Sequence, residues 1–175
     1  MTAFERFRSS FLRSLAPATF AVAAVCAAAA TSFAATVTTT FTVSATVLSV
    51  CSVSATNMSF GNYTASSGTP NDITSSVNVT CSNGTPYTVG LDAGLGTGAT
   101  VANRLMTSGG NTLGYGIFTS NARTTTWGDG TLSTATIAGT GNGSAQGVTA
   151  YGRIPISQFV PSGSYADTIT ATVTY

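Results

Sequence analysis

The sequence contains no histidine, no lysine and a single glutamate, and this scarcity of ionisable side chains excludes several kinds of chemistry. A serine or cysteine nucleophile needs a base such as histidine, and a zinc site needs histidine or free cysteine ligands. Charged residues make up 6% of the chain, too few to neutralise many phosphates of a nucleic acid. We therefore expect neither an enzyme, nor a metal protein, nor a nucleic-acid-binding protein.

Aspartate supplies all the remaining carboxylates after Glu5, at positions 72, 92, 129 and 167. Glycoside hydrolysis needs a pair of carboxylates, but Asp72 and Asp129 lie in turn sequences and Asp167 lies in a predicted strand. We interpret all four as turn residues, surface charges or partners of arginines such as Arg153. The glycines at 94, 96 and 98 lack the lysine and the helix of a phosphate-binding loop, so we expect no cofactor.

Cysteine is also scarce, with only Cys26, Cys51 and Cys81 in the chain. Cys26 lies in a segment that we expect to be removed, which leaves one pair. In an exported protein such a pair predicts a disulfide between Cys51 and Cys81. Closing that loop stabilises the fold by about 3–4 kcal/mol in the chain-entropy description.

The first 34 residues have the pattern of a bacterial signal peptide. Arg6, Arg8 and Arg13 precede an apolar, alanine-rich run from Leu15 to Ala30. Ser32 and Ala34 then place small residues at the two positions that signal peptidase reads, which predicts cleavage after Ala34. The run is interrupted by Pro17 and is shorter than the roughly 20 residues of a membrane span, so we expect export and no stable membrane anchor.

Beyond the leader the chain shows period-two alternation and no helical periodicity. Such alternation is typical of strands with one buried and one solvated face. The predicted strands cover residues 73–81, 87–93, 113–117, 148–154 and 165–175. Turn sequences such as Asn83-Gly84, Asp129-Gly130 and Pro161-Ser162-Gly163 separate them, and residues 139–147 form a predicted flexible connection. Many short strands with regular turns predict a single immunoglobulin-like β-sandwich.

The segment just after the leader alternates most regularly of all. One face carries the apolar residues together with Thr39, and the other carries only Thr or Ser; the apolar residues are Val37, Phe41, Val43, Ala45 and Val47. At Val47-Leu48 the phase breaks, and Leu48 and Val50 begin a new pattern leading to Cys51. Because a one-residue slip inverts every side chain, we expect two strands here, with residues 35–47 as a separate N-terminal arm.

The opposite end of the chain alternates up to its last residue, Tyr175. We expect this strand to leave one sheet edge open, with Ile169, Ala171, Val173 and Tyr175 beside it. A free strand at one end and an open edge at the other are matched features. Together they predict polymerisation by strand addition.

The order and spacing of several motifs resemble those of the spore coat protein U domain family, which includes the pilin subunits of archaic chaperone–usher pili. The motifs are Cys51-Ser-Val53, Phe60-Gly61-Asn62-Tyr63, the run from Val79 to Asp92, the run from Leu113 to Phe118, Arg123, the run from Trp127 to Thr131, the run from Tyr151 to Pro155, and the run from Pro161 to Asp167. The resemblance covers essentially the whole chain after the leader.

The resemblance implies an incomplete immunoglobulin-like β-sandwich, residues 48–175, that lacks its final strand. A periplasmic chaperone fills the resulting groove first, and the N-terminal strand of the next subunit replaces it at the outer-membrane usher. The implied partners are therefore identical or homologous pilin subunits, the chaperone and the usher. The implied destination is a cell-surface fibre that serves adhesion and biofilm formation.

Two alternatives remain open at this stage. The family name also covers coat proteins of bacterial spores, and the sequence does not separate coat from pilus. Trp127, with Arg123 and Asp129, could also form a sugar-stacking site of a secreted, self-complete carbohydrate-binding module. We favour a packed tryptophan at a hairpin, because large aromatic side chains usually belong to cores.

Overall fold

The computed structural model describes residues 32–175, so the predicted signal peptide lies outside the described residues except for its last three. Residues 45–175 form one compact unit, and residues 32–44 do not belong to it. Within residues 32–175 there is no helix, and hence none that could cross a membrane.

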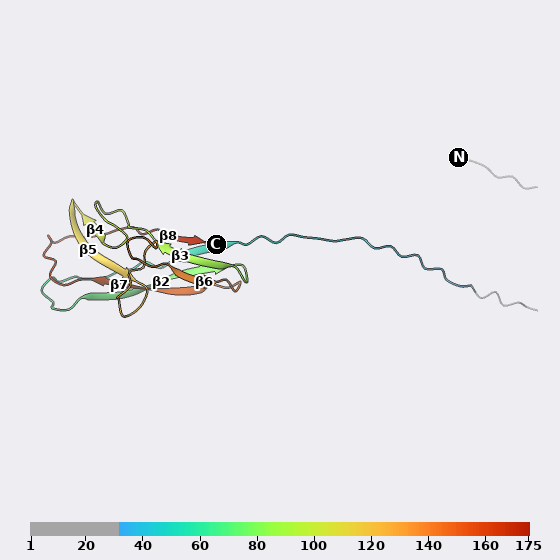
Figure 1. The fold of residues 1–175 in the computed structure, drawn as a ribbon. Helices are drawn as coiled ribbons and strands as arrows, with labels where there is room; N and C mark the ends of the chain where they lie inside the picture. The colour runs from blue at the N-terminus through green and yellow to red at the C-terminus, as the bar shows by residue number, and fades with distance from the viewer. Residues whose placement is uncertain (1–31) are drawn as a thin grey trace, which may run out of the picture. The chain divides into compact units, whose positions relative to one another are not determined.

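Eight strands build the compact unit (Figure 1). They are β1 (Cys51–Ala55), β2 (Asn71–Cys81), β3 (Pro86–Leu91), β4 (Arg104–Ser108), β5 (Asn111–Phe118), β6 (Ile137–Thr140), β7 (Gln146–Ile154) and β8 (Ala171–Thr174). The predicted all-β fold is confirmed.

The strands form two sheets, and each pair of neighbouring strands is antiparallel. A five-stranded sheet has the order β1-β2-β7-β5-β4, and a three-stranded sheet has the order β6-β3-β8. The turn after β2 carries Gly84 at a φ of +80°, a conformation that favours glycine, and the chain passes there from the first sheet to the second. The two sheets enclose one core, which confirms the predicted sandwich.

The core consists of the alternating residues that the sequence pattern marks. Val77, Val79 and Cys81 of β2 meet Val89 and Leu91 of β3, and all five are buried. Trp127 is also fully buried, between strands rather than on one, and its indole Nε1–H donates to the Val89 carbonyl at 2.9 Å. A buried indole needs such a partner, and this one joins the Trp127 loop to β3.

The alternation-based predictions agree with β2, β3, β5 and β7, whereas one prediction is wrong. The connection at residues 139–147 is not loop throughout, because Gly139 and Thr140 extend β6 along β3, and β7 begins at Gln146. The strand expected after the phase break at Val47-Leu48 begins only at Cys51, as β1, and Leu48 and Val50 before it are exposed. Ser49 accepts a hydrogen bond from the Thr85 hydroxyl at 3.2 Å.

The predicted strand at Tyr165–Tyr175 is shorter than expected. Only residues 171–174 pair with β3, as β8. Ala166 instead pairs with Thr107 of β4, so the chain contacts one sheet at residue 166 and joins the other at residue 171. A segment that crosses between two sheets cannot hold a single ladder along its whole length, and its alternation does not reveal this.

The predicted disulfide joins Cys51 to Cys81, which lie directly opposite each other at the start of β1. Just before it, the Val50 N–H donates to the Ser82 hydroxyl at 3.1 Å and the Ser82 N–H donates to the Val50 carbonyl at 2.9 Å. Covalent and hydrogen-bonded contacts therefore meet at one end of β1, where the chain leaves for the N-terminal arm.

Removing the disulfide with Cys51→Ala and Cys81→Ala together should lower the free energy of unfolding by about 3–4 kcal/mol, because the unfolded chain regains loop entropy. Urea denaturation of the oxidised protein and of the double variant measures this difference. Reductant should destabilise the wild type and leave the double variant unchanged. An equal effect of reductant on both proteins would contradict the assignment.

Candidate functional site

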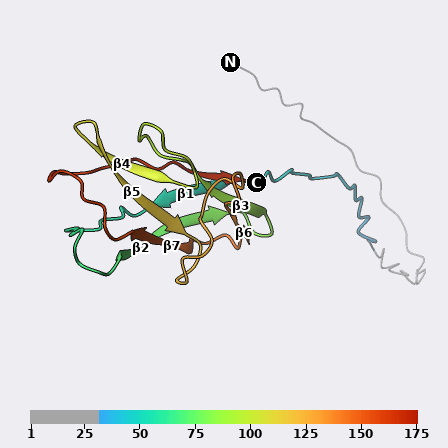
Figure 2. The same ribbon diagram turned by 60° about the vertical axis from the view of Figure 1, so that its left-hand side comes forward.

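An elongated groove of about 1120 Å³ opens beside the core of the compact unit. One wall is the segment that follows β1, residues 55–65, and the other is residues 158–171, which lead into β8. Figures 1 and 2 show both segments extending towards the end of the sandwich away from the C-terminus. Neither wall is a strand over most of its length, although both are ordered by the contacts described below.

The floor of the groove is the apolar core itself. Its inward-facing side chains include Leu91 of β3, Leu113 and Ile117 of β5, and Ala150 and Ile154 of β7. Met58, Phe60 and Tyr63 line the first wall and pack against this floor, and the Phe60 ring meets the Tyr115 ring edge-on at 6.2 Å between centroids. A groove with such a floor favours an apolar occupant, because covering it removes hydrocarbon surface from water.

Hydrogen bonds to Asp167 hold the second wall. One carboxylate oxygen accepts from the Tyr115 hydroxyl at 2.7 Å, and the other accepts from the Leu95 N–H at 2.7 Å. Burial raises the pKa of the Tyr115 phenol, and the bond to Asp167 raises it further, so the phenol stays protonated and continues to donate. Asp92 acts similarly further along, accepting from the Thr170 N–H at 2.9 Å.

Arg104 supports this wall from inside the core, where only 1% of its surface is exposed. Its guanidinium donates to the carbonyls of Leu91 at 3.3 Å, Asp92 at 2.8 Å and Trp127 at 2.8 Å. Burial lowers its pKa, while Tyr115 and the nearby aspartates oppose that shift. Arg104 thus joins the end of β3 to the Trp127 loop. It binds the carbonyl of Asp92, the residue whose carboxylate contacts the second wall.

Among residues 32–175, β8 pairs with β3 on one side only. Alternate backbone groups of an antiparallel strand point to opposite sides, so the groups on the other side of β8, where β1 lies close by, form no ladder in this part of the chain. Of the four residues predicted beside this edge, Ile169 and Ala171 line the groove, Val173 packs against the core, and Tyr175 is 60% exposed. The groove therefore extends from Ala171 back to Gln158, earlier in the chain than predicted.

The predicted N-terminal arm is extended chain without strand pairing in the described residues. Its apolar side chains are exposed to an unusual degree, with Val37 at 94%, Phe41 at 84%, Val43 at 83% and Val47 at 89%. Ala45 is exposed too. A row of apolar side chains in water is costly, since each buried Val or Phe is worth about 1.5–3 kcal/mol.

The sugar-stacking interpretation of Trp127 is wrong. A tryptophan with no exposed surface cannot present its ring face to a ligand. Asp129 accepts hydrogen bonds from the N–H and the hydroxyl of Thr131 and so closes its own turn. Arg123 donates to the carbonyls of Gly152 and Asn121, so the three predicted residues do not form one site.

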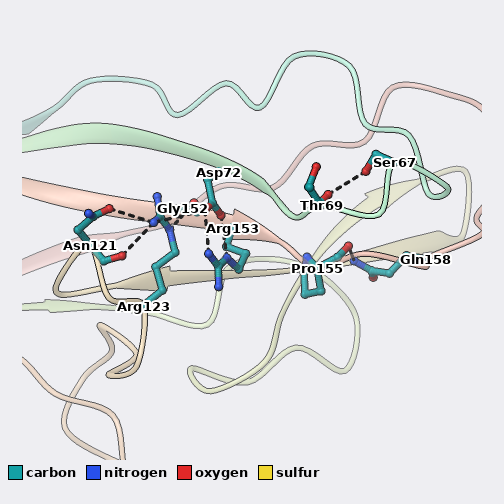
Figure 3. Close-up of polar contacts among 9 residues, drawn as sticks. All are labelled: Ser67, Thr69, Asp72, Asn121, Arg123, Gly152, Arg153, Pro155 and Gln158. Carbon is teal, nitrogen blue, oxygen red and sulfur yellow. Dashed lines mark hydrogen bonds and ion pairs between the residues drawn. The ribbon is translucent and has the colours of Figure 1, made fainter.

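Arg153 pairs with Asp72, as one of the arginine–aspartate pairs that the sequence suggests (Figure 3). The two residues are direct cross-strand neighbours on β7 and β2, and two hydrogen bonds of 2.7 Å join their side chains. Arg123 approaches the same carboxylate at 3.4 Å while donating to Asn121. The bond from Arg153 lowers the pKa of Asp72.

No group of three potential metal-ligating side chains occurs within the described part of the chain. Sequence reasoning missed three residues that shape the groove: Arg104, Tyr63 and Gln158. Arg104 gave a weak signal as one of three arginines beyond the leader. Gln158 gave none, because its role depends on where β7 ends.

Comparison with known proteins gives similarities of two kinds, to a family model and to solved structures. The family model described as Spore Coat Protein U domain matches residues 37–172, which includes both the arm and the sandwich. A chain in the crystal structure of the CsuC-CsuE chaperone-tip adhesion subunit pre-assembly complex, from archaic chaperone-usher Csu pili of Acinetobacter baumannii, matches with 31% identity and a TM-score of 0.53. The match covers 74% of this chain and 40% of that one, so this chain spans less than half of that relative. No curated protein matches.

The Asp72–Arg153 pair predicts a dependence of stability on pH. Since the folded-state pKa of Asp72 lies below its ordinary value of 3.8, its contribution is complete above that pH and is lost as the pH falls through the folded-state pKa. Asp72→Asn should therefore destabilise the protein at pH 7, by no more than about 1 kcal/mol for so exposed a pair. The difference should disappear near pH 2 in paired urea denaturations. A difference that persists in acid would contradict the ion-pair explanation.

Proposed function

Because the chain belongs to the Spore Coat Protein U domain family, we propose that it is a structural subunit of an extracellular pilus assembled by the chaperone–usher route. The groove of each subunit accepts the N-terminal arm of the next one as an added strand. One observation carries this proposal: the same chain holds an exposed apolar arm and an open apolar groove. The arm is an apolar strand without a partner, and the groove is an apolar floor without a strand over it.

The length of the arm suits a groove of this kind. The arm from Val37 to Val47 has 11 residues, and at about 3.3 Å per residue it spans about 35 Å when extended. The second wall, residues 158–171, is longer in sequence but is not a strand over most of its length. We place the whole apolar face of the arm along this wall.

The faces of the arm also suit the groove. Its odd-numbered apolar side chains turn to the floor, and its even-numbered Thr and Ser side chains turn to water. Burying the four larger side chains contributes about 1.5–3 kcal/mol each, and hydrogen bonds to the free edge of β8 add to this. Ordering the arm costs entropy, so the net gain is smaller than the sum. Slow release of the inserted strand makes the fibre durable.

The arm of the same molecule is a poor occupant. β2 runs antiparallel to β1, and β3 reverses direction again after the turn that follows β2. β8 is antiparallel to β3, so it runs in the direction opposite to β1. An arm that pairs antiparallel with β8 therefore runs parallel to β1. Its last residue, Val47, then lies at the end of the groove farthest from the start of β1. Only Leu48, Ser49 and Val50 separate Val47 from Cys51, and so short a link cannot span the groove.

If the arm of the same molecule instead runs parallel to β8, and so antiparallel to β1, the chain must reverse its direction tightly between Val47 and Cys51. Two-residue hairpin turns need a positive φ and are built from Gly, Asn or Asp. The intervening Leu48-Ser49-Val50 contains none of these, and β-branched Val50 disfavours a positive φ. The arm of a second copy meets neither obstacle.

Export and assembly partners follow from the same proposal. The predicted signal peptide directs the chain to the periplasm, where the cysteines can oxidise. A periplasmic chaperone protects the groove until an outer-membrane usher joins successive subunits at the cell surface. A relative crystallised in a chaperone–subunit complex supports the chaperone step. Roles of the fibre in adhesion and biofilm formation are part of the proposal.

A spore-coat polymer is the second candidate, favoured by the description of the family. It uses the same arm and the same groove, so it differs from a pilus only in where the polymer is deposited. Genes for a chaperone and an usher beside this one favour the pilus. Their absence, with protein located in spores, favours the coat.

Deleting residues 35–46 should abolish polymerisation, because no arm remains to fill a neighbouring groove. Wild-type periplasmic protein should run as a heat-labile ladder on an unboiled denaturing gel, and the deletion variant as a single band. A synthetic peptide of residues 35–47 should then raise the thermal midpoint of the variant. A variant that is folded, monomeric and indifferent to the peptide would show that the domain is complete without an added strand.

A pair of substitutions separates the two faces of the arm. Phe41→Asp places a charge on the face that enters the groove and should eliminate the ladder, because a carboxylate would be buried without a partner. Thr42→Asp places the same charge one residue away on the solvent face and should leave the ladder intact. Equal ladders from both variants, or the loss of both, would exclude the proposed orientation of the arm.

A further inference from the structure

The two walls of the groove are tied to each other at one end. The Tyr63 hydroxyl, from the first wall, donates to the Pro155 carbonyl at 2.8 Å and accepts from the Gln158 N–H at 3.0 Å. Beside it, the Ser157 N–H donates to the Ala65 carbonyl at 3.1 Å. Among the side-chain hydrogen bonds of the groove, only these Tyr63 bonds join residues 55–65 to the chain from 155 to 171 within the described residues.

Pro155 explains why this tie is needed. In the antiparallel register of β5 and β7, Gly116 pairs with Arg153. Two residues further along, the same register would place Gly114 opposite residue 155. A proline there has no N–H to donate to the Gly114 carbonyl. The ladder between β5 and β7 therefore ends, and both backbone groups of Gly114 on that side need another partner.

Gln158 supplies that partner with its side chain. Its amide oxygen accepts from the Gly114 N–H at 2.8 Å, and its amide nitrogen donates to the Gly114 carbonyl at 2.8 Å. The carboxamide thus replaces one residue of β7 in the ladder. Figure 3 shows Gln158 beside Pro155, just past the end of the strand. The backbone of Gln158 is held at the same time by Tyr63, so one residue connects β5 to both walls.

We propose that Tyr63 and Gln158 are positioning residues of the strand-acceptor groove, which fix the spacing of its walls before the donor strand arrives. The proposal rests on the proposed function and adds a specific means by which the empty groove stays competent. Without a tie, an apolar groove tends to narrow, because closer walls bury its floor. Once a strand is inserted, its own hydrogen bonds and side chains keep the walls apart, and the tie matters less.

Because the tie acts before the donor strand is inserted, its loss should change the rate of peptide association rather than the rate of dissociation. The test uses the full-length exported protein with Phe41→Asp in its own arm, so that no arm fills a groove, and a fluorescent peptide of residues 35–47 with the natural sequence in excess. This background counts as the wild type in the comparisons that follow. Tyr63→Phe removes only the hydroxyl, and Gln158→Met removes the carboxamide at nearly constant length. Each should slow peptide association about three- to tenfold, as the loss of one or two hydrogen bonds predicts. Dissociation rates should change less than twofold.

Tyr165→Phe is the matched control. The Tyr165 hydroxyl donates to the Pro161 carbonyl at 2.8 Å. The substitution therefore removes a similar hydrogen bond, but one within the second wall instead of between the two walls. Its association rate should equal that of the wild type. A purely structural role for Tyr63 would instead lower the thermal midpoints of free and peptide-bound protein equally and leave association unchanged.

The outcomes separate this inference from the proposed function. If the wild type fails to bind the peptide, the strand-acceptor function itself fails. If the wild type binds and Tyr63→Phe behaves like Tyr165→Phe, the function stands and the positioning role is overturned. Slower association in both Tyr63→Phe and Gln158→Met, without faster dissociation, supports the positioning role.

Discussion

The structure depends on one constraint: a hydrophobic floor between two sheets must be covered, and residues 55–65 and 158–171 cover only its margins. In a complete sandwich a paired strand lies over such a floor and satisfies the sheet edge at the same time. Here β8 keeps one free side, and the apolar arm is exposed. Under the proposed function, another copy supplies the missing strand, so that assembly continues folding.

An open groove in water requires polar reinforcement, and the structure places it where ladders are absent. The second wall runs irregularly from Gln158 to Thr170, and side chains satisfy its backbone in place of a neighbouring strand. Asp92 accepts from Thr170, and Asp167 is itself held by the buried Tyr115 phenol. Arg104 stiffens the layer beneath by binding three carbonyls at once. Three of the seven charged residues beyond the predicted leader serve this purpose.

The sequence predicts the regular part of the fold well, because period-two alternation records which side chains face the core. β2, β3, β5 and β7 follow directly from it, whereas the Cys51–Cys81 pairing follows from the single pair of cysteines expected in the exported chain. β6 was missed because its Ala-Gly-Thr composition reads as a loop, and its partner β3 decides its conformation. The groove walls were misplaced for a similar reason: alternation from Tyr165 onward does not show that Ala166 pairs with β4. Polar ties such as Gln158 to Gly114 depend on the endpoint of a strand, which no local pattern marks.

In the proposed fibre, the root of the arm would set how closely successive subunits can lie. Val50 is hydrogen-bonded to Ser82, and the disulfide fixes the very next residue, so the body of the domain begins there. The apolar face of the arm ends at Val47, which leaves only Leu48 and Ser49 between an inserted strand and the body. The three steps from Val47 to Val50 extend at most about 11 Å, less than the width of a domain. Under the proposed function, neighbouring subunits would therefore touch near this root, where the side chains of Leu48 and Val50 are exposed.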